Sequence, residues 1–242
     1  MGSQGLNQYQ QPVGPSVSKE MAMDIPQTPL EGRYCRIVVT DPQAHASGLF
    51  EQLSQAPDDR DWTYMVDGPF ARFDDYQAFL ERMATTPGQT YYTIMEADSG
   101  MAVGNAALMR QDAANGVIEI GNIMYSRRLQ HTVAGSEAIF LLMQRALETM
   151  NYRRLEWKCD SLNGPSQRAA RRYGFQFEGV FRQAVLYKGR NRDTSWYSII
   201  DTEWPAISRG FRRWLSDDNF DANGKQRARL GDLIAQSRQA TQ

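Results

Sequence analysis

The stretch that decides the fold runs from Gly116 to Ala138 and reads GVIEIGNIMYSRRLQHTVAGSEA. Its first ten residues are rich in β-branched side chains, which predicts a buried strand over 116–125. A polar loop follows, and a helical run with one apolar stripe then extends from Ser136 to Glu148. A loop that opens a helix presents free backbone N–H groups and the positive end of the helix dipole, which together favour an anion such as phosphate.

Two common nucleotide-binding motifs, GxGxxG and GxxxxGK[ST], are absent from this stretch. A phosphate ligand would therefore need another kind of cradle, to which Arg127 and Arg128 would add positive charge. The same spacing also fits an ordinary strand–loop–helix connection of an α/β domain.

The loop carries a family resemblance. Gln130-His-Thr-Val-Ala-Gly135 resembles the Gln/Arg-x-x-Gly-x-Gly/Ala pyrophosphate loop of GNAT acetyltransferases, and Ser136-Glu-Ala138 is similar to the Thr-Glu-Ala that follows it in RimJ/RimL-type members. Val133 replaces the central glycine of the motif. Valine keeps its N–H group, so the cradle can survive with less backbone freedom.

A second block supports the same family. Asn163-Gly-Pro-Ser-Gln-Arg-Ala-Ala-Arg-Arg-Tyr-Gly-Phe175 predicts a helix capped by Asn163 or Ser166 and ended by Gly174 in a left-handed conformation. Followed by Glu178-Gly179 and by further blocks up to Trp204, it resembles the last cofactor-binding segment and the tail of the RimJ/RimL-type branch. The resemblance covers about residues 33 to 205.

Length and composition narrow the class of protein. The 242 residues suit one domain with extensions, and 41% hydrophobic residues are enough for a core. A formal charge of −1 argues against nucleic acid as a partner, and no apolar run approaches the length that spans a membrane. Two isolated cysteines and two histidines predict reduced thiols and no metal site. We expect a cytoplasmic protein, because no signal pattern opens the chain.

The expected fold is of the α/β (α+β) type. A strand over 33–39, helices over 41–53 and 74–83, and a hairpin of 91–96 with 102–109 precede the central strand, and a strand over 153–160 follows it. The resemblance implies a GNAT fold: a mixed, mostly antiparallel sheet with flanking helices, in which the strands 117–125 and 153–159 form a splayed parallel pair. We expect a disordered arm or surface strap over 1–31, the acetyltransferase domain over 32–205, and a C-terminal extension over 206–242 with helices at 207–215 and 227–234.

The resemblance further implies acetyl-CoA as co-substrate and names the residues that would hold it. The pantetheine arm of acetyl-CoA would lie between the splayed strands. The terminal 3′-phosphate would meet one or two of five arginines, Arg127, Arg128, Arg168, Arg171 and Arg172. Each of these arginines also fits a solvated surface charge. The cofactor-binding residues we expect are Arg128, Gln130, His131, Thr132, Val133, Ala134, Gly135, Ser136, Asn163 and Ser166.

Acetyl transfer to an amine needs a group that removes a proton from the amine and one that assists the leaving thiolate. Glu119 is our candidate base, since family members commonly place a base on this strand; Glu156 is the alternative, and Glu119 also fits an outward-facing residue paired with an arginine. Strict alternation puts Glu119 on one face with Val117, Gly121, Ile123 and Tyr125, so burial among apolar neighbours would raise its pKa. Ser166 is the candidate acid, because Ala170 occupies the position of the usual tyrosine and Tyr173 is expected to pack in the core.

The acceptor is weakly encoded. Side chains that could shape its pocket are Trp62, Tyr64, Phe70, Arg182, Tyr187, Asp193 and Trp196. The leading hypothesis is an acetyl-CoA-dependent N-acetyltransferase that acetylates a primary amine of a protein N-terminus or a small molecule by direct attack on the thioester. The alternatives are a non-catalytic acyl-CoA-binding module of the same fold and a small-molecule or antibiotic-detoxifying acetyltransferase; a homodimer is possible.

Overall fold

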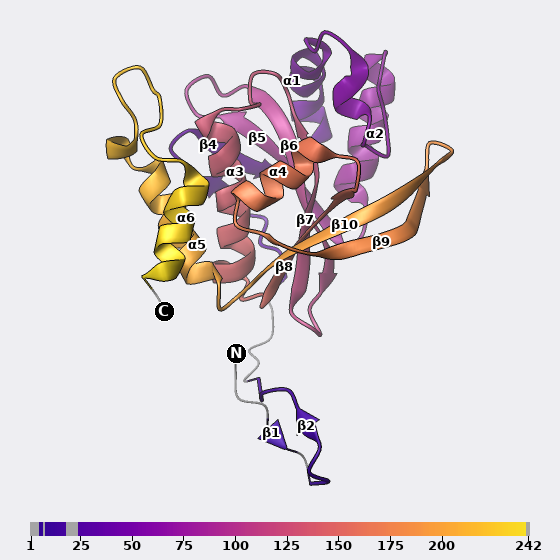
Figure 1. The fold of residues 1–242 in the computed structure, drawn as a ribbon. Helices are drawn as coiled ribbons and strands as arrows, with labels where there is room; N and C mark the ends of the chain where they lie inside the picture. Colours follow the sequence, from indigo (N-terminus) through magenta and orange to yellow (C-terminus); the bar gives the residue numbers. More distant parts are fainter. Residues whose placement is uncertain (1–4, 7, 18–23, 241–242) are drawn as a thin grey trace.

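The computed structural model describes residues 5–6, 8–17 and 24–240, and its main body is one eight-stranded sheet with helices on both faces (Figure 1). In spatial order the strands are β3 (Leu30–Glu31), β4 (Cys35–Val39), β5 (Gln89–Glu96), β6 (Ala102–Asp112), β7 (Val117–Tyr125), β8 (Arg154–Asp160), β10 (Arg190–Ile200) and β9 (Gln176–Tyr187). A separate two-stranded sheet pairs β1 (Gly5–Leu6) with β2 (Pro12–Val13).

Six α-helices accompany the sheet within the described residues: α1 (Pro42–Ser54), α2 (Phe73–Thr85), α3 (Val133–Gln144), α4 (Gly164–Arg172), α5 (Trp204–Leu215) and α6 (Leu230–Gln239). The short helices are η1 (Asp59–Trp62), η2 (Arg145–Thr149, a π-turn that continues α3) and η3 (Asp217–Asn219). Within the large sheet β7 and β8 pair in parallel, and the other neighbours pair antiparallel. The predicted mixed, mostly antiparallel α+β fold is therefore confirmed.

Two hydrophobic clusters lie on opposite faces of the sheet. The larger one joins β7 and β8 to α3, α4, α5 and α6, and the smaller one packs α1 and α2 against β5 and β6. Ile118 and Leu155 point into the larger cluster from the parallel strands. This arrangement follows from the period of two along a strand, which sends successive side chains to opposite faces.

Glu137, the middle residue of the Ser-Glu-Ala motif, has a structural task. Its buried carboxylate accepts hydrogen bonds from the backbone N–H groups of Arg33, Tyr34 and Cys35 at 2.9, 2.6 and 2.9 Å. A Cβ atom on Gly32 would lie only 2.5 Å from this carboxylate. The motif thus fixes the turn between β3 and β4 to the N-terminal part of α3.

The C-terminal helices extend the main core. Phe140 of α3 stacks on Phe211 of α5 with ring centroids 4.8 Å apart. Gly210 lets α6 approach α5 closely, because a Cβ atom there would lie 2.6 Å from the side chain of Ile234. The helices predicted at 207–215 and 227–234 correspond to α5 and α6. Of the extension predicted over 206–242, these two helices share the core of the residues before it, and residues 241–242 lie outside the described residues.

The segment before β3 is held by Arg145, whose buried guanidinium donates to the backbone carbonyls of Pro26 and Thr28 at 2.9 and 3.0 Å. Of the arm predicted over 1–31, residues 1–4, 7 and 18–23 lie outside the described residues.

Across the described part of the chain, none of the helices combines the length and the apolar character of a membrane-crossing segment, and no group of three or more metal-ligating side chains forms a candidate metal site. Cys35 and Cys159 are buried free thiols, as predicted.

Candidate active site

The site is built around the point where β7 and β8 separate. The two strands pair only at Val117 with Arg154, Ile118 with Leu155, and Glu119 with Glu156. Beyond this register β7 stays paired with β6 as far as Tyr125, and β8 stays paired with β10 as far as Asp160. Their facing edges therefore diverge without a strand between them.

A bulge in β7 changes which side chains face the base candidate. Asn122 adopts a positive φ of 49°, and the register with β6 shifts between Asn105 and Ala107. The extra residue in β7 reverses the alternation after it. Ile123 and Tyr125 therefore pack on the larger hydrophobic cluster, whereas Met124 joins the smaller one. The expectation that Glu119 shares its face with Ile123 and Tyr125 is wrong, because an irregular ladder breaks the alternation on which it rested.

The predicted phosphate cradle, the backbone amides around Gln130 to Ser136, corresponds to the end of the loop after β7 and the first turn of α3. The helix begins at Val133 rather than at Ser136, because the Thr132 hydroxyl caps it by accepting from the Gly135 N–H at 3.1 Å. Within the described chain the backbone N–H groups of His131, Val133 and Ala134 have no hydrogen-bond partner. They are the unpaired donors that a helix N-terminus offers to an anion.

Gly135 is required by close packing. A Cβ atom there would lie 2.8 Å from the Leu129 carbonyl oxygen and 3.0 Å from the ring of Tyr125. The Tyr125 hydroxyl donates to the Gly135 carbonyl at 2.8 Å, which ties the end of β7 to the first turn of α3. The loop between them is consequently held at both ends.

The arginines near this loop have different partners. Arg128 pairs with Glu96 through two hydrogen bonds of 2.7 and 3.0 Å, which hold the pKa of that carboxyl below its ordinary value. Arg172 of α4 donates to the Ser136 hydroxyl at 2.9 Å and so reaches the first turn of α3. Arg168 and Arg171 are exposed. Arg127 contacts Asp61 of η1, with 3.1 Å between nitrogen and oxygen.

The second predicted block forms α4 at the other side of the divergence. Asn163 caps this helix by accepting from the Ser166 N–H at 3.1 Å. The Ser166 hydroxyl oxygen accepts from the indole N–H of Trp157 at 2.9 Å, which leaves the hydroxyl proton able to donate elsewhere. Ala170 is fully buried, and Tyr173 packs in the core, where burial raises its pKa.

Glu119 lies at the vertex of the diverging strands and is 3% exposed. Its carboxylate contacts the ammonium of Lys158 at 2.9 Å and the guanidinium of Arg110 at 2.8 Å. Lys158 also contacts Glu156 at 2.7 Å. The apolar surroundings expected for Glu119 are thus incorrect, because strand neighbours two residues apart place charged side chains on this face.

This charge cluster continues across the sheet to β9. Arg154 contacts Glu156 at 2.8 Å and Glu178 at 2.7 Å, and it holds the pKa of Glu178 below its ordinary value. Sequence reasoning missed Lys158 and Arg110. The signal for Lys158 was present, since Arg154, Glu156 and Lys158 recur at a period of two in one strand.

Three loops meet beside the face of the sheet that carries the charge cluster around Glu119. The Tyr64 hydroxyl donates to the Leu162 carbonyl at 3.0 Å, and the Lys188 ammonium donates to the Trp62 carbonyl at 2.9 Å. Tyr187 donates to the Asp160 carboxylate at 2.9 Å, and burial raises the pKa of Tyr187 to about 12. The segment after α1, the loop after β8 and the tip of the β9–β10 hairpin are therefore in contact.

The other predicted acceptor residues lie at two places. Phe70 packs edge-on against Trp62 at 5.4 Å between ring centroids, under the first of these loops. Trp196 stacks on Phe181 with ring centroids 4.4 Å apart, and the Lys158 ammonium lies 3.9 Å from the centroid of the Trp196 ring. Lys158 thus joins the aromatic pair on the hairpin to the charge cluster.

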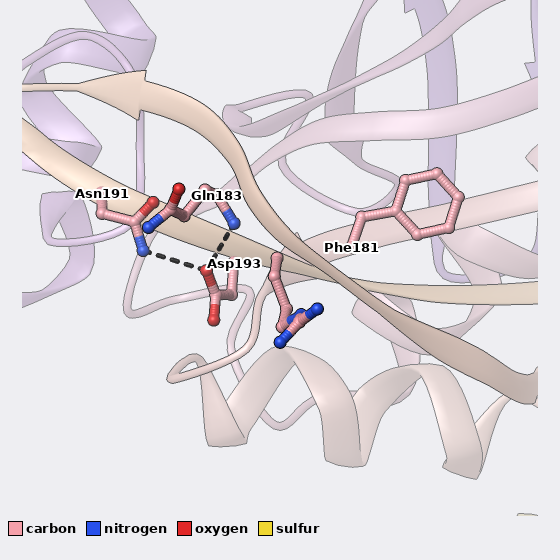
Figure 2. A pocket seen from close by; sticks show the side chains of 5 residues that line it. Phe181, Gln183, Asn191 and Asp193 are labelled. Carbon is pink, nitrogen blue, oxygen red and sulfur yellow. Dashed lines mark hydrogen bonds between the residues drawn. The ribbon is translucent and has the colours of Figure 1, made fainter.

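Arg182 and Asp193 line a shallow polar pocket on the hairpin (Figure 2). Asp193 accepts from the Gln183 N–H at 2.7 Å and from the Asn191 side-chain amide at 2.9 Å, as the dashed lines show. Gln183 has a positive φ of 50°, and the strand register shifts opposite Asp193. The carboxylate of Asp193 therefore stabilises a bulge.

Comparisons with known proteins agree with this geometry. The family model described as "Acetyltransferase (GNAT) domain" matches residues 36–176. The crystal structure of a GCN5-related N-acetyltransferase from Brucella melitensis is 38% identical, with a TM-score of 0.87 over 90% of this chain and 100% of that one. A probable GNAT-family acetyltransferase from Chromobacterium violaceum is 36% identical, with a TM-score of 0.74 over 81% of this chain and 99% of that one.

A curated relative, the uncharacterized N-acetyltransferase p20 of Bacillus licheniformis, is 29% identical over 47% of this chain. The match spans 63% of the length of that relative. Because the family model covers more than half of the chain, the protein belongs to the GNAT family of N-acetyltransferases, as its motifs predicted.

Proposed function

We propose that this protein is an acetyl-CoA-dependent N-acetyltransferase that acetylates a primary amine, on a protein N-terminus or on a small molecule. The observation that carries the proposal is the divergence of β7 and β8 at Glu119, with the free amides of α3 at its open end. A RimL protein acetyltransferase of the same fold, 17% identical with a TM-score of 0.57, has been crystallised with coenzyme A.

The first turn of α3 fits the pyrophosphate of acetyl-CoA. The N–H groups of His131, Val133 and Ala134 can donate to phosphate oxygens, and Gly135 lets the loop pack closely against Tyr125 and Leu129 behind them. Val133 donates through its backbone, so its side chain does not block this role. Arg172, already at the Ser136 hydroxyl, is the nearest candidate cation on α4.

The other residues predicted to contact acetyl-CoA are weaker candidates than these backbone amides. Gln130 and Thr132 shape the loop through their side chains, since Gln130 donates to the Tyr125 carbonyl at 3.0 Å and Thr132 caps the helix. Asn163 keeps its side-chain N–H₂ free to donate, because capping uses only its carbonyl oxygen. Arg128 would have to leave Glu96 to bind a phosphate, which makes it the weakest candidate.

Acetyl-CoA, when bound, supplies an acetyl thioester for attack by the acceptor nitrogen. A new C–N bond forms, the C–S bond breaks, and the amine must lose a proton. We assign that proton to Glu119. Its buried partner Lys158 is 9% exposed, but Arg110 is 57% exposed and reaches the carboxylate from solvent. The acceptor ammonium would replace Arg110 at Glu119, and the Ser166 hydroxyl would donate to the leaving sulfur.

The test is thiol release from acetyl-CoA in the presence of a panel of amines. The panel contains free amino acids, lysine-free peptides with open N-termini, polyamines and aminoglycosides; matched peptides with blocked N-termini are the control. Release that depends on a free amine supports the proposal, and the active members of the panel separate a protein acceptor from a small-molecule one. Tight acetyl-CoA binding without release for any amine would instead favour the non-catalytic module.

A further inference from the structure

The short helix η1 connects two parts of the proposed active site that are far apart in the sequence. Its Asp61 carboxylate lies 3.1 Å from the Arg127 guanidinium and accepts from the Gln130 side-chain amide at 3.2 Å. Arg127 in turn donates to the Gln130 carbonyl oxygen at 3.2 Å. Three side chains therefore form a closed set of contacts between η1 and the loop that precedes α3.

The same segment reaches the acceptor side through its next residues. The Trp62 carbonyl accepts from Lys188 at the tip of the β9–β10 hairpin, and the Tyr64 hydroxyl donates to Leu162 in the loop after β8. Residues 61–64 thus touch the cofactor loop at one end and both acceptor loops at the other.

We propose that Asp61 couples these two sites by competing with acetyl-CoA for Arg127. This inference rests on the proposed function, because it needs a pyrophosphate at the first turn of α3. Arg127 belongs to the loop that leads to this turn, so a bound pyrophosphate would offer its guanidinium a second anion besides the Asp61 carboxylate, and a guanidinium fork satisfies only one anion with full geometry. Arg127 turns to the phosphate, and the η1 segment loses its tie to the loop.

Release of η1 loosens the segment that bridges the acceptor loops. Coupling between sites is reciprocal, so a change at Asp61 that weakens its contact with Arg127 and leaves the arginine in place must also strengthen acetyl-CoA binding. Replacement of Asp61 is therefore expected to raise the affinity for acetyl-CoA and not to lower it.

The experiment measures coenzyme A binding by calorimetry and amide hydrogen exchange of residues 56–66, in wild type, Asp61→Asn and Asp59→Asn. Asp59→Asn is the matched control, because it removes the same charge from the same exposed segment two residues away. We expect Asp61→Asn to lower the coenzyme A Kd about fivefold and Asp59→Asn to leave it nearly unchanged. Coenzyme A should speed exchange over 56–66 in wild type, whereas in Asp61→Asn exchange is already fast.

A second variant keeps the test independent of the first. Arg127→Gln removes the shared cation, so it should speed exchange over 56–66 without ligand and weaken coenzyme A binding. Equal or weaker coenzyme A binding by folded Asp61→Asn, or slower exchange of wild-type 56–66 upon binding, would overturn the coupling while the proposed function stands. Failure of the wild type to bind coenzyme A at all would overturn both.

Discussion

The two faces of the parallel strand pair are built from the same strands, but one face is apolar and the other is charged. On one face Ile118 and Leu155 are completely buried under α3 and the C-terminal helices. On the other face, the buried carboxylates of Glu119 and Glu156 form a cluster of charges with the partly buried ammonium of Lys158. Alternation along the strand supplies both faces from one stretch of sequence.

The comparison separates stability from chemistry. Apolar burial stabilises the fold in proportion to the area removed from water. Buried ion pairs contribute little or nothing net, because removing the charges from water costs about as much as their attraction returns. We therefore propose that the charge cluster at the vertex of the strands serves the reaction more than the stability of the fold. The predictions below test this division.

The largest effect is expected on the apolar face. Phe211→Ala removes a fully buried ring that stacks on Phe140, and should lower the free energy of unfolding by about 3–5 kcal/mol. Denaturant unfolding followed by circular dichroism measures it. Phe181→Ala on the hairpin, whose ring is 55% exposed, is the control and should cost far less. If Phe211→Ala lost as little stability as Phe181→Ala, the C-terminal helices would add little to the core.

On the charged face, Glu119→Gln should preserve the fold and acetyl-CoA binding but slow turnover about a hundredfold, the usual scale of general-base catalysis. The loss should shrink at higher pH, where the acceptor amine deprotonates without help. Initial rates of thiol release between pH 7 and 9, with the best amine of the panel, give both results. Normal turnover near pH 7 would place the base elsewhere, and Glu156→Gln would then be the next variant to measure.

A substitution at the N-terminus of α3 tests whether this helix, which covers the apolar face, also binds the cofactor. Ala134→Pro removes one free N–H group in the first turn of the helix and should weaken coenzyme A binding about tenfold. Asp74→Pro at the corresponding position of α2 is the matched control for stability. Calorimetry measures the affinity; an unchanged Kd in a folded variant would exclude this turn as the cradle.

The smallest effect concerns the solvent edge of the charge cluster. Arg154 depresses the pKa of Glu178 below its ordinary value of 4.5, so this contact stabilises the fold above that pH and is lost as the pH falls through the lowered value. Glu178→Gln should therefore be less stable than wild type by at most about 1 kcal/mol at pH 7, and the difference should be smaller at pH 3. Thermal unfolding at both values measures this; an equal difference at both would contradict the assignment.

Much of the fold was predictable from local pattern. The strand 117–125, the helix behind it and the capped helix after Asn163 follow from hydrophobic period, turn residues and caps. These signals need only neighbours in the sequence, so a single chain carries them. The family resemblance added the mixed, mostly antiparallel sheet and its parallel strand pair, whereas the full order of the strands came from the structure. The N-terminus of α3 was misplaced by three residues because Thr132, and not a later residue, provides the cap.

The candidate site depended on tertiary structure at the points where chemistry is decided. The sequence determined that Glu119 lies in the central strand; only the folded sheet brought Lys158 and Arg110 to its carboxylate. Alternation failed beyond Asn122 because a bulge depends on how two strands register, and one strand does not encode its partner's register. Likewise Asp61 and Arg127 meet across 66 residues of chain. Contacts between charges so far apart are set by the packing of loops, for which local sequence has no period.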